Sequence, residues 1–218
     1  MRLEFLRFMS AWGEPIAPVT VADSYFEEYA DLLPEPMLDL WREIGFAGFG
    51  DGLLWICDPH IWQPIVNTWL DGLAIPDLYA GTQIPIFRTA YGKIYCFKPG
   101  VGPKLTIMPM SSIVSFGRPS SLSTKKWIDR EMTAFLELPR RLFKQSATYM
   151  SGTEDPLQED MFERIVGRLG LTTHDTIYSF DPPPQLRGWV RAENAVVADA
   201  ATELTRLRTL EVPEVETK

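Results

Sequence analysis

The spacing of apolar residues predicts a helix, a turn and a buried strand in the segment 33–57. Between residues 33 and 44 the apolar positions lie three and four apart, which places them on one helix face: Leu33, Met37, Leu40, Trp41 and Ile44. Gly45 follows, and glycine suits the left-handed residue that ends a helix. Residues 46–52 contain three glycines and predict a turn. The unbroken apolar run 53–57 is too short for a helix and predicts a strand covered on both faces.

A second helix is predicted directly after this strand. Asp58 suits its N-cap and Pro59 its first helical position, where no N–H is needed. Apolar residues recur every fourth position from Ile61 to Trp69, and Asp71-Gly72 ends the helix. A general acid–base pair of Asp58 and His60 is the alternative, but the helix cap is the better interpretation of Asp58.

Alternating and apolar runs in the middle of the chain predict an antiparallel meander. Residues 84–97 read as a hairpin whose turn, Tyr91 to Lys93, holds Gly92 where a positive φ is needed. Residues 104–116 read as one or two further strands, interrupted at Pro109. Consecutive strands joined by short turns form a meander.

Helical spacing and short apolar runs fill the rest of the chain. Helices are expected at 1–12, 23–32, 123–138, from Pro156 to 169, and over 200–210 with Asp199 as N-cap. Short strands are expected at 177–180 and 195–197, a proline-rich connection at 12–21, and a frayed charged tail at 211–218. The order of elements predicts an α+β fold with a mixed or antiparallel sheet flanked by helices. Two regions, 1–82 and 83–218, are expected, or one continuous domain.

Charge is distributed unevenly along the 218 residues. Residues 1–80 carry 13 acidic and 3 basic residues, residues 81–150 carry 3 and 11, and residues 151–218 carry 13 and 7. The acidic first third disfavours direct nucleic-acid binding, because phosphates would be repelled, and favours a basic partner. Mutual neutralisation of the three segments after folding is an equally good interpretation.

Patterns of catalysis, metal binding and membrane insertion are missing from the sequence. It contains no nucleophile elbow, P-loop or dinucleotide fingerprint. Two histidines and two cysteines make a zinc site improbable, and Cys57 and Cys96 fit buried reduced thiols. We expect no cofactor and no enzyme activity. No apolar segment has the length of a membrane span, and no signal-peptide cleavage pattern is present, so we expect a cytoplasmic protein that does not bind membranes.

The tryptophans divide into two groups. Trp41, Trp55, Trp62 and Trp69 occupy core positions of predicted helices and strands. Trp12, Trp127 and Trp189 have weaker core patterns and are the better candidates for exposure.

The block from residue 33 to residue 72 resembles the GAD-like domain, a family found in bacterial immunity proteins that guard against DNase toxins of type VI secretion. The positions that carry the resemblance are Leu33-Pro34, Trp41, Gly45-Phe46, Asp51-Gly52-Leu53, Trp55, Asp58-Pro59, Trp69-Leu70 and Gly72. It extends further along the chain through Arg88-Thr89-Ala90-Tyr91-Gly92, Leu169-Gly170, Asp175, Ile177-Tyr178, Phe180 and Pro182. Thr176, Ser179 and the segment 183–188 depart from the family pattern.

The resemblance implies a SUKH-like GAD domain followed by a C-terminal α+β half, and the function of an immunity protein. Such a protein would bind and neutralise a cognate toxin, here a DNase effector, by direct protein contact. A DNase needs a basic DNA-binding surface, so acidic residues outside the predicted core are the candidate toxin-binding residues. They are Asp51, Asp58, Asp71, Asp77, Asp175 and Asp181.

A ligand-binding regulator or enzyme with a pocket between the two halves is the alternative function. The hairpin residues Arg88, Tyr91 and Lys93 would then bind an anion. A convergent set of buried polar groups in the main pocket would favour this alternative over toxin binding. The sequence indicates neither the oligomeric state nor the mode of toxin inhibition.

Overall fold

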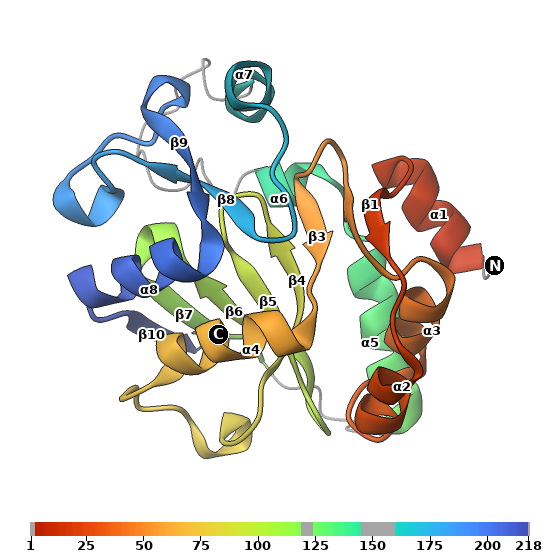
Figure 1. Ribbon diagram of the computed structural model, residues 1–218. Helices are drawn as coiled ribbons and strands as arrows, with labels where there is room; N and C mark the ends of the chain where they lie inside the picture. Colours follow the sequence, from red (N-terminus) through yellow and green to blue (C-terminus); the bar gives the residue numbers. More distant parts are fainter. Residues whose placement is uncertain (1–2, 119–123, 145–159, 218) are drawn as a thin grey trace.

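The protein is built on one large, mostly antiparallel β-sheet with helices on both faces (Figure 1). The computed structural model describes residues 3–118, 124–144 and 160–217. The strands are β1 (Ile16–Val19), β2 (Phe46–Phe49), β3 (Leu54–Ile56), β4 (Ile84–Thr89), β5 (Ile94–Lys98), β6 (Gly102–Met108), β7 (Ile113–Phe116), β8 (Thr176–Phe180), β9 (Ala195–Asp199) and β10 (Glu214–Thr217). The α-helices are α1 (Leu3–Trp12), α2 (Asp23–Tyr29), α3 (Glu35–Glu43), α4 (Pro59–Leu70), α5 (Lys125–Leu136), α6 (Arg141–Lys144), α7 (Met161–Leu169) and α8 (Ala200–Leu210).

The large sheet has the strand order β1-β2-β3-β4-β5-β6-β7-β10, and β8 and β9 form a second, two-stranded sheet. Neighbouring strands of the large sheet are antiparallel, apart from β10, which runs parallel to β7. These elements confirm the predicted α+β class with a mixed sheet.

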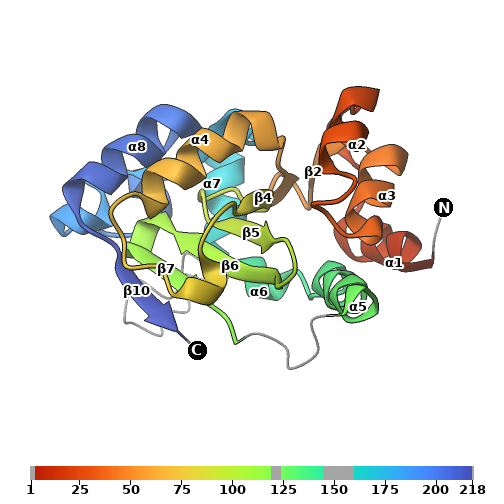
Figure 2. The ribbon, with the colours of Figure 1, turned by 90° about the horizontal axis from the view of Figure 1, so that it is seen from below.

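Helices α4 and α8 lie side by side over one face of the sheet, and α5 packs on the other face against β6 (Figure 2). The indole nitrogen of Trp69 in α4 donates to the main-chain oxygen of Leu204 in α8 over 3.1 Å, which ties the two helices together. Helices α1, α2 and α3 gather beside the β1–β2 end of the sheet (Figure 1). No helix in the described part of the chain is long and apolar enough to cross a membrane.

The local sequence signals around α3, β3 and α4 are confirmed. Helix α3 is followed by Gly45 with φ +82°, and β3 is buried along its length. Asp58 caps α4 by accepting from the main-chain N–H of His60 over 2.9 Å. Gly92, in the turn between β4 and β5, has φ +74° as the hairpin requires.

The turn predicted over residues 46–52 is wrong in its first half, which forms strand β2. Gly48 serves packing rather than turning, because a Cβ atom there would lie 2.7 Å from the Trp55 ring. Phe46 and Phe49 are both buried. The turn itself is confined to Gly50–Gly52, where all three residues have positive φ.

Two segments expected to be irregular also form strands. The proline-rich connection contains β1, which pairs with β2, and the charged tail contains β10, which pairs with β7. Both strands lie at the ends of the sheet and depend on partners distant in the sequence. The predicted start of a helix at Pro156 lies outside the described residues. Within the described residues, this helix is α7, which begins at Met161.

The large sheet crosses residue 82, because β3 pairs with β4. A domain boundary at residue 82 would therefore cut through one sheet. The proposed division into two regions stays a prediction. Both cysteines are free and buried, and burial raises the pKa of each thiol.

The core positions predicted for Trp41, Trp55, Trp62 and Trp69 are confirmed, since each is at most 3% exposed. Trp189 is exposed as expected. The expectation for Trp12 is wrong: its ring packs against Phe8 and Phe143, on elements that the local pattern does not bring together.

Candidate partner-binding surface

Asp58, one of the six acidic residues predicted to bind a partner, is occupied within the fold. Its carboxylate caps α4 and also accepts from the hydroxyl of Tyr25 over 2.9 Å. Burial, followed by the hydrogen bond to Asp58, raises the pKa of Tyr25 to about 12. Asp58 is half-buried, and its two hydrogen bonds join α4 to α2.

Asp51 and Asp175 belong to loops that contact each other. Asp51 is exposed in the β2–β3 turn and accepts from the Arg140 guanidinium over 2.9 Å. The next residue, Gly52, accepts through its main-chain oxygen from the hydroxyl of Thr172 over 3.1 Å. Asp175 is exposed three residues further along that second loop.

The other three predicted acidic residues lie elsewhere on the surface. Asp71 follows α4, Asp77 begins a short 3₁₀ helix, and Asp181 follows β8; all three are exposed. The six residues are therefore distributed over several elements. Their role in partner binding stays a prediction.

Arg88, expected in the alternative function to bind an anion, is fully buried. Its guanidinium carbon lies 5.2 Å from the ring centroid of Trp55 and 4.9 Å from that of Trp62. The guanidinium also donates to the main-chain oxygens of Thr173 and His174. Burial lowers the pKa of Arg88 to about 10. An anion from solvent has no access to this cation, so the anion site expected on the hairpin is not formed by Arg88.

The segment 172–174, which Arg88 holds, is a junction between the two halves of the chain. The Trp55 indole nitrogen donates to the Thr172 hydroxyl over 3.0 Å, and the His174 ring lies 4.8 Å from the Trp55 ring. A ring nitrogen of His174 also lies 2.8 Å from the main-chain oxygen of Ala17 in β1. The other histidine, His60, has a ring nitrogen 2.9 Å from the carboxylate of Glu28. Within the described residues, no group of three or more His, Cys, Asp or Glu side chains could hold a metal ion.

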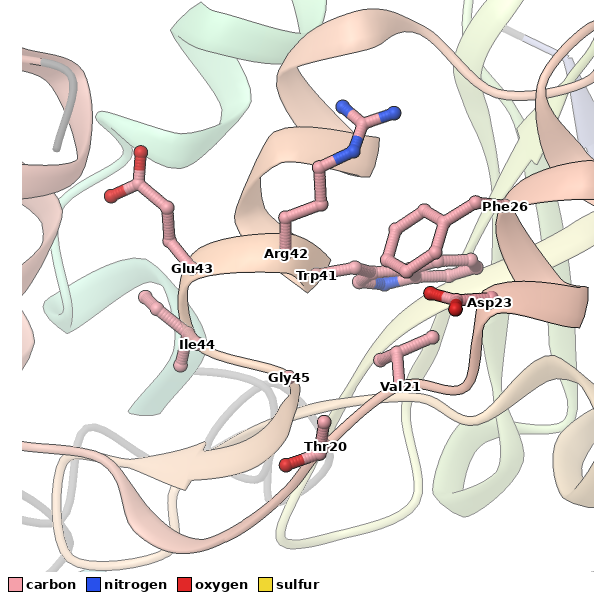
Figure 3. Close-up of a pocket in the computed structure, with 9 residues that line it drawn as sticks. All are labelled: Thr20, Val21, Asp23, Phe26, Trp41, Arg42, Glu43, Ile44 and Gly45. Carbon is pink, nitrogen blue, oxygen red and sulfur yellow. The ribbon is translucent and has the colours of Figure 1, made fainter.

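A surface pocket of about 300 Å³ lies between α2, α3 and the connection from β1 to α2 (Figure 3). Its lining residues are Thr20, Val21, Asp23, Phe26, Trp41, Arg42, Glu43, Ile44 and Gly45. In Figure 3 Asp23 and Val21 lie on one side of the space, Glu43 and Ile44 on the other, and Thr20 and Gly45 along its floor. The pocket is formed within residues 20–45 and so does not lie between the two halves of the chain.

Two donors of this pocket, Arg42 and Trp41, differ in how they are satisfied. Arg42 is already neutralised, since its guanidinium donates to Glu35 over 2.8 Å and to Asp39 over 2.7 Å and lies 5.0 Å from the Phe26 ring centroid. Trp41 is 1% exposed, and its indole nitrogen has no acceptor among the described residues. Beside its two carboxylates, Asp23 and Glu43, the pocket therefore has one compensated cation and one buried donor without a partner among the described residues.

Acidic residues are concentrated on α2, on α3 and in the connection between them, and two of these residues, Asp23 and Glu43, line the pocket. Arg42 is the only Lys or Arg between Phe8 and Phe87, whereas twelve acidic residues occur in that interval. Those on and between the two helices are Asp23, Glu27, Glu28, Asp31, Glu35, Asp39 and Glu43. None of these seven residues is among the toxin-binding residues predicted from the sequence. The high density of acidic residues in this segment could have identified them.

Comparison with known proteins supports the sequence resemblance. The family model described as the GAD-like domain matches residues 4–111. The chain is also similar to the crystal structure of Atu4351 from Agrobacterium tumefaciens, with a TM-score of 0.73 and 20% sequence identity over 93% of this chain and 87% of that chain. At this identity the likeness shows the fold alone. No curated protein matches the chain. The match to the GAD-like domain family covers residues 4–111, which is just under half of the chain.

Proposed function

We propose that this chain is an immunity protein that binds and neutralises an antibacterial toxin by direct protein contact. The toxin class that fits best is a DNase effector of type VI secretion, as the family resemblance implies. In this role the protein performs no catalysis and needs no cofactor. It acts in the cytoplasm of the cell that it protects.

The observation that carries the proposal is the acidic surface of α2 and α3 on a GAD-like domain. A protein that acts on DNA presents a basic surface to the phosphates. Seven acidic residues between Asp23 and Glu43 would attract that surface, speed association at low salt, and repel DNA from it. Toxin bound there would be kept from its substrate. Blocking the toxin's active site and locking it in an inactive conformation both remain compatible with this surface.

The proposal is tested by co-expressing the chain with the product of the neighbouring gene. We expect the two proteins to co-purify and the host DNA to stay intact, whereas the neighbour alone degrades it. A neighbour that is harmless, or that stays toxic and forms no complex, would contradict the proposal.

The electrostatic part is tested with charge-reversal variants. Glu27 and Asp31 are exposed and form no side-chain hydrogen bond or ion pair among the described residues, so Glu27→Lys/Asp31→Lys should fold normally. We expect this double variant to bind the toxin at least tenfold more weakly, mainly through slower association. Glu211→Lys, an exposed reversal after α8, is the control and should keep most of the affinity.

A regulator that binds a small ligand is the second candidate. One observation favours it: the buried indole nitrogen of Trp41 lines a pocket and has no acceptor among the described residues. At about 300 Å³ the pocket is at the lower end of the range for small-molecule sites.

A further inference from the structure

We propose that the pocket between α2, α3 and Thr20–Val21 receives an arginine or lysine side chain from an extended segment of a protein partner. The partner's main-chain oxygen accepts from the indole nitrogen of Trp41, and its cationic side chain lies against Asp23 and the end of α3. The identity of the partner as a toxin rests on the proposed function, but the chemistry of the pocket does not.

The donor of Trp41 is the feature that points to an occupant. A buried N–H without an acceptor costs about 1–3 kcal/mol, so proteins rarely retain one unless water or a ligand satisfies it. The Trp41 ring packs edge-on against Tyr25, Tyr29 and Phe46, with centroids 5.3 to 6.3 Å apart. This aromatic cluster fixes the indole, so its nitrogen cannot turn towards another acceptor. In Figure 3 the nitrogen lies on the ring edge that faces the pocket.

The charges around the pocket select a cation. The pocket lies at the C-terminal end of α3, where the helix dipole is negative. The carboxylate of Asp23, at the start of α2, has no partner among the described residues. Arg42 does not oppose a second cation strongly, because its guanidinium points back along α3 to Glu35 and Asp39.

The donor and the charges together exclude simpler ligands. A phosphate or carboxylate could accept from Trp41 but would be repelled by the acidic helices. A polyamine would suit the charges but offers no acceptor. A peptide with a basic side chain supplies both a main-chain oxygen and a cation, and a pocket of about 300 Å³ holds one side chain rather than a large ligand.

The test is an NMR titration of the full-length protein with blocked peptides. The indole N–H signals are followed in ¹⁵N-labelled protein, and Trp41→Phe identifies the signal of Trp41. The probes are acetylated, amidated pentapeptides with glycine at four positions and arginine, lysine, glutamine or glutamate in the centre. Spermine, free arginine and inorganic phosphate complete the set.

We expect the arginine and lysine peptides to shift the Trp41 signal with millimolar affinity, and the glutamine and glutamate peptides to bind at least fivefold more weakly. Asp23→Asn should weaken the binding of the arginine peptide at least fivefold. Glu211→Gln removes the same charge elsewhere and should leave the affinity unchanged. Because Asp23 is exposed, its variant keeps the fold, which the remaining indole signals verify.

Four results would overturn the proposal. The first is an unmoved Trp41 signal at saturating arginine peptide. The second is a shift caused equally by the glutamate peptide, phosphate or spermine. The third is an equal effect of Asp23→Asn and Glu211→Gln. Free arginine binding at least tenfold more tightly than the blocked peptide would also overturn it, and would favour a small-ligand regulator.

Failure of this inference is distinguishable from failure of the proposed function. If the wild-type chain captures the toxin and Asp23→Asn captures it equally well, the immunity role stands and the pocket is not the docking site. If no toxin is captured but the arginine peptide binds at Trp41, the pocket inference stands and the immunity role fails.

Discussion

The guanidinium of Arg88 lies 4.9 Å from the ring centroid of Trp62 and donates to the main-chain oxygen of His174, 86 residues further along the chain. No carboxylate is hydrogen-bonded to this buried cation within the described residues; aromatic faces and carbonyl dipoles stabilise it instead. Arg88 thereby joins the central sheet to the segment that follows α7.

Arg88→Leu should destabilise the protein by about 2–4 kcal/mol, because the oxygens of Thr173 and His174 lose their donor inside the protein. Arg88→Lys should also cost more than about 1 kcal/mol, since a point-like ammonium cannot stack on two rings and serve both oxygens. Urea unfolding followed by circular dichroism measures both effects.

Arg191→Leu is the matched control for Arg88. Its guanidinium also lies over an indole, 4.7 Å from the Trp189 ring centroid, but both side chains are exposed. This variant should change stability by about 1 kcal/mol or less. Equal losses for Arg88→Leu and Arg191→Leu would contradict the role given to burial.

Two tyrosines with raised pKa values, Tyr25 and Tyr178, predict a loss of stability at alkaline pH. The folded state keeps the Tyr25 proton up to a pKa of about 12, whereas the unfolded chain releases it near 10. The unfolded state therefore binds fewer protons between these values, and the free energy of unfolding falls as the pH rises from about 10 to 12. Tyr178, with a pKa raised by burial to about 12, contributes in the same direction.

The measurement is urea unfolding at several pH values, with tyrosinate absorbance as a direct reading of ionisation. Tyr25→Phe should make the decline in stability above pH 10 shallower. Asp58→Asn should lower the pKa of Tyr25, because it removes the negative charge that the hydroxyl faces. An unchanged alkaline profile in both variants would rule out this assignment.

Local signals predicted the elements around α3, β3 and α4, because caps, glycines and apolar spacing act over a few residues. Strands β1 and β10 were missed because each depends on a partner about 30 to 100 residues away, and their own residues carry no strong β pattern. The same limit applies to the site. Helical spacing placed Trp41 in the core, but only the packing of α2 against α3 leaves its nitrogen without an acceptor.

The cap of α4 should contribute measurably to stability. Asp58→Ala removes the acceptor of both the His60 N–H and the Tyr25 hydroxyl, and should cost about 1–2 kcal/mol. Asp58→Asn should cost less, since asparagine also caps helices. Asp71→Ala, at the opposite end of α4, is the control; it should change stability by about 0.5 kcal/mol or less. Thermal unfolding that shows equal losses at both ends would count against the cap.

Alanine substitutions at two glycines distinguish the effect of side-chain packing on stability from the effect of backbone propensity. Gly48→Ala places a Cβ atom 2.7 Å from the buried Trp55 ring, and the ring has no room to move, because its nitrogen is bonded to Gly52 and Thr172. We expect a loss of about 1–3 kcal/mol from overpacking. Displacement of the Trp55 ring by the added Cβ atom should also weaken the junction between β3 and the segment 172–174.

Gly167→Ala in α7 should have the opposite sign. A Cβ atom there meets no heavy atom within 4 Å, and alanine favours the helix over glycine by about 0.5–1 kcal/mol. Chemical denaturation of the two single variants compares them directly. If Gly48→Ala were neutral, the close approach of β2 to Trp55 would not be what requires glycine in this strand.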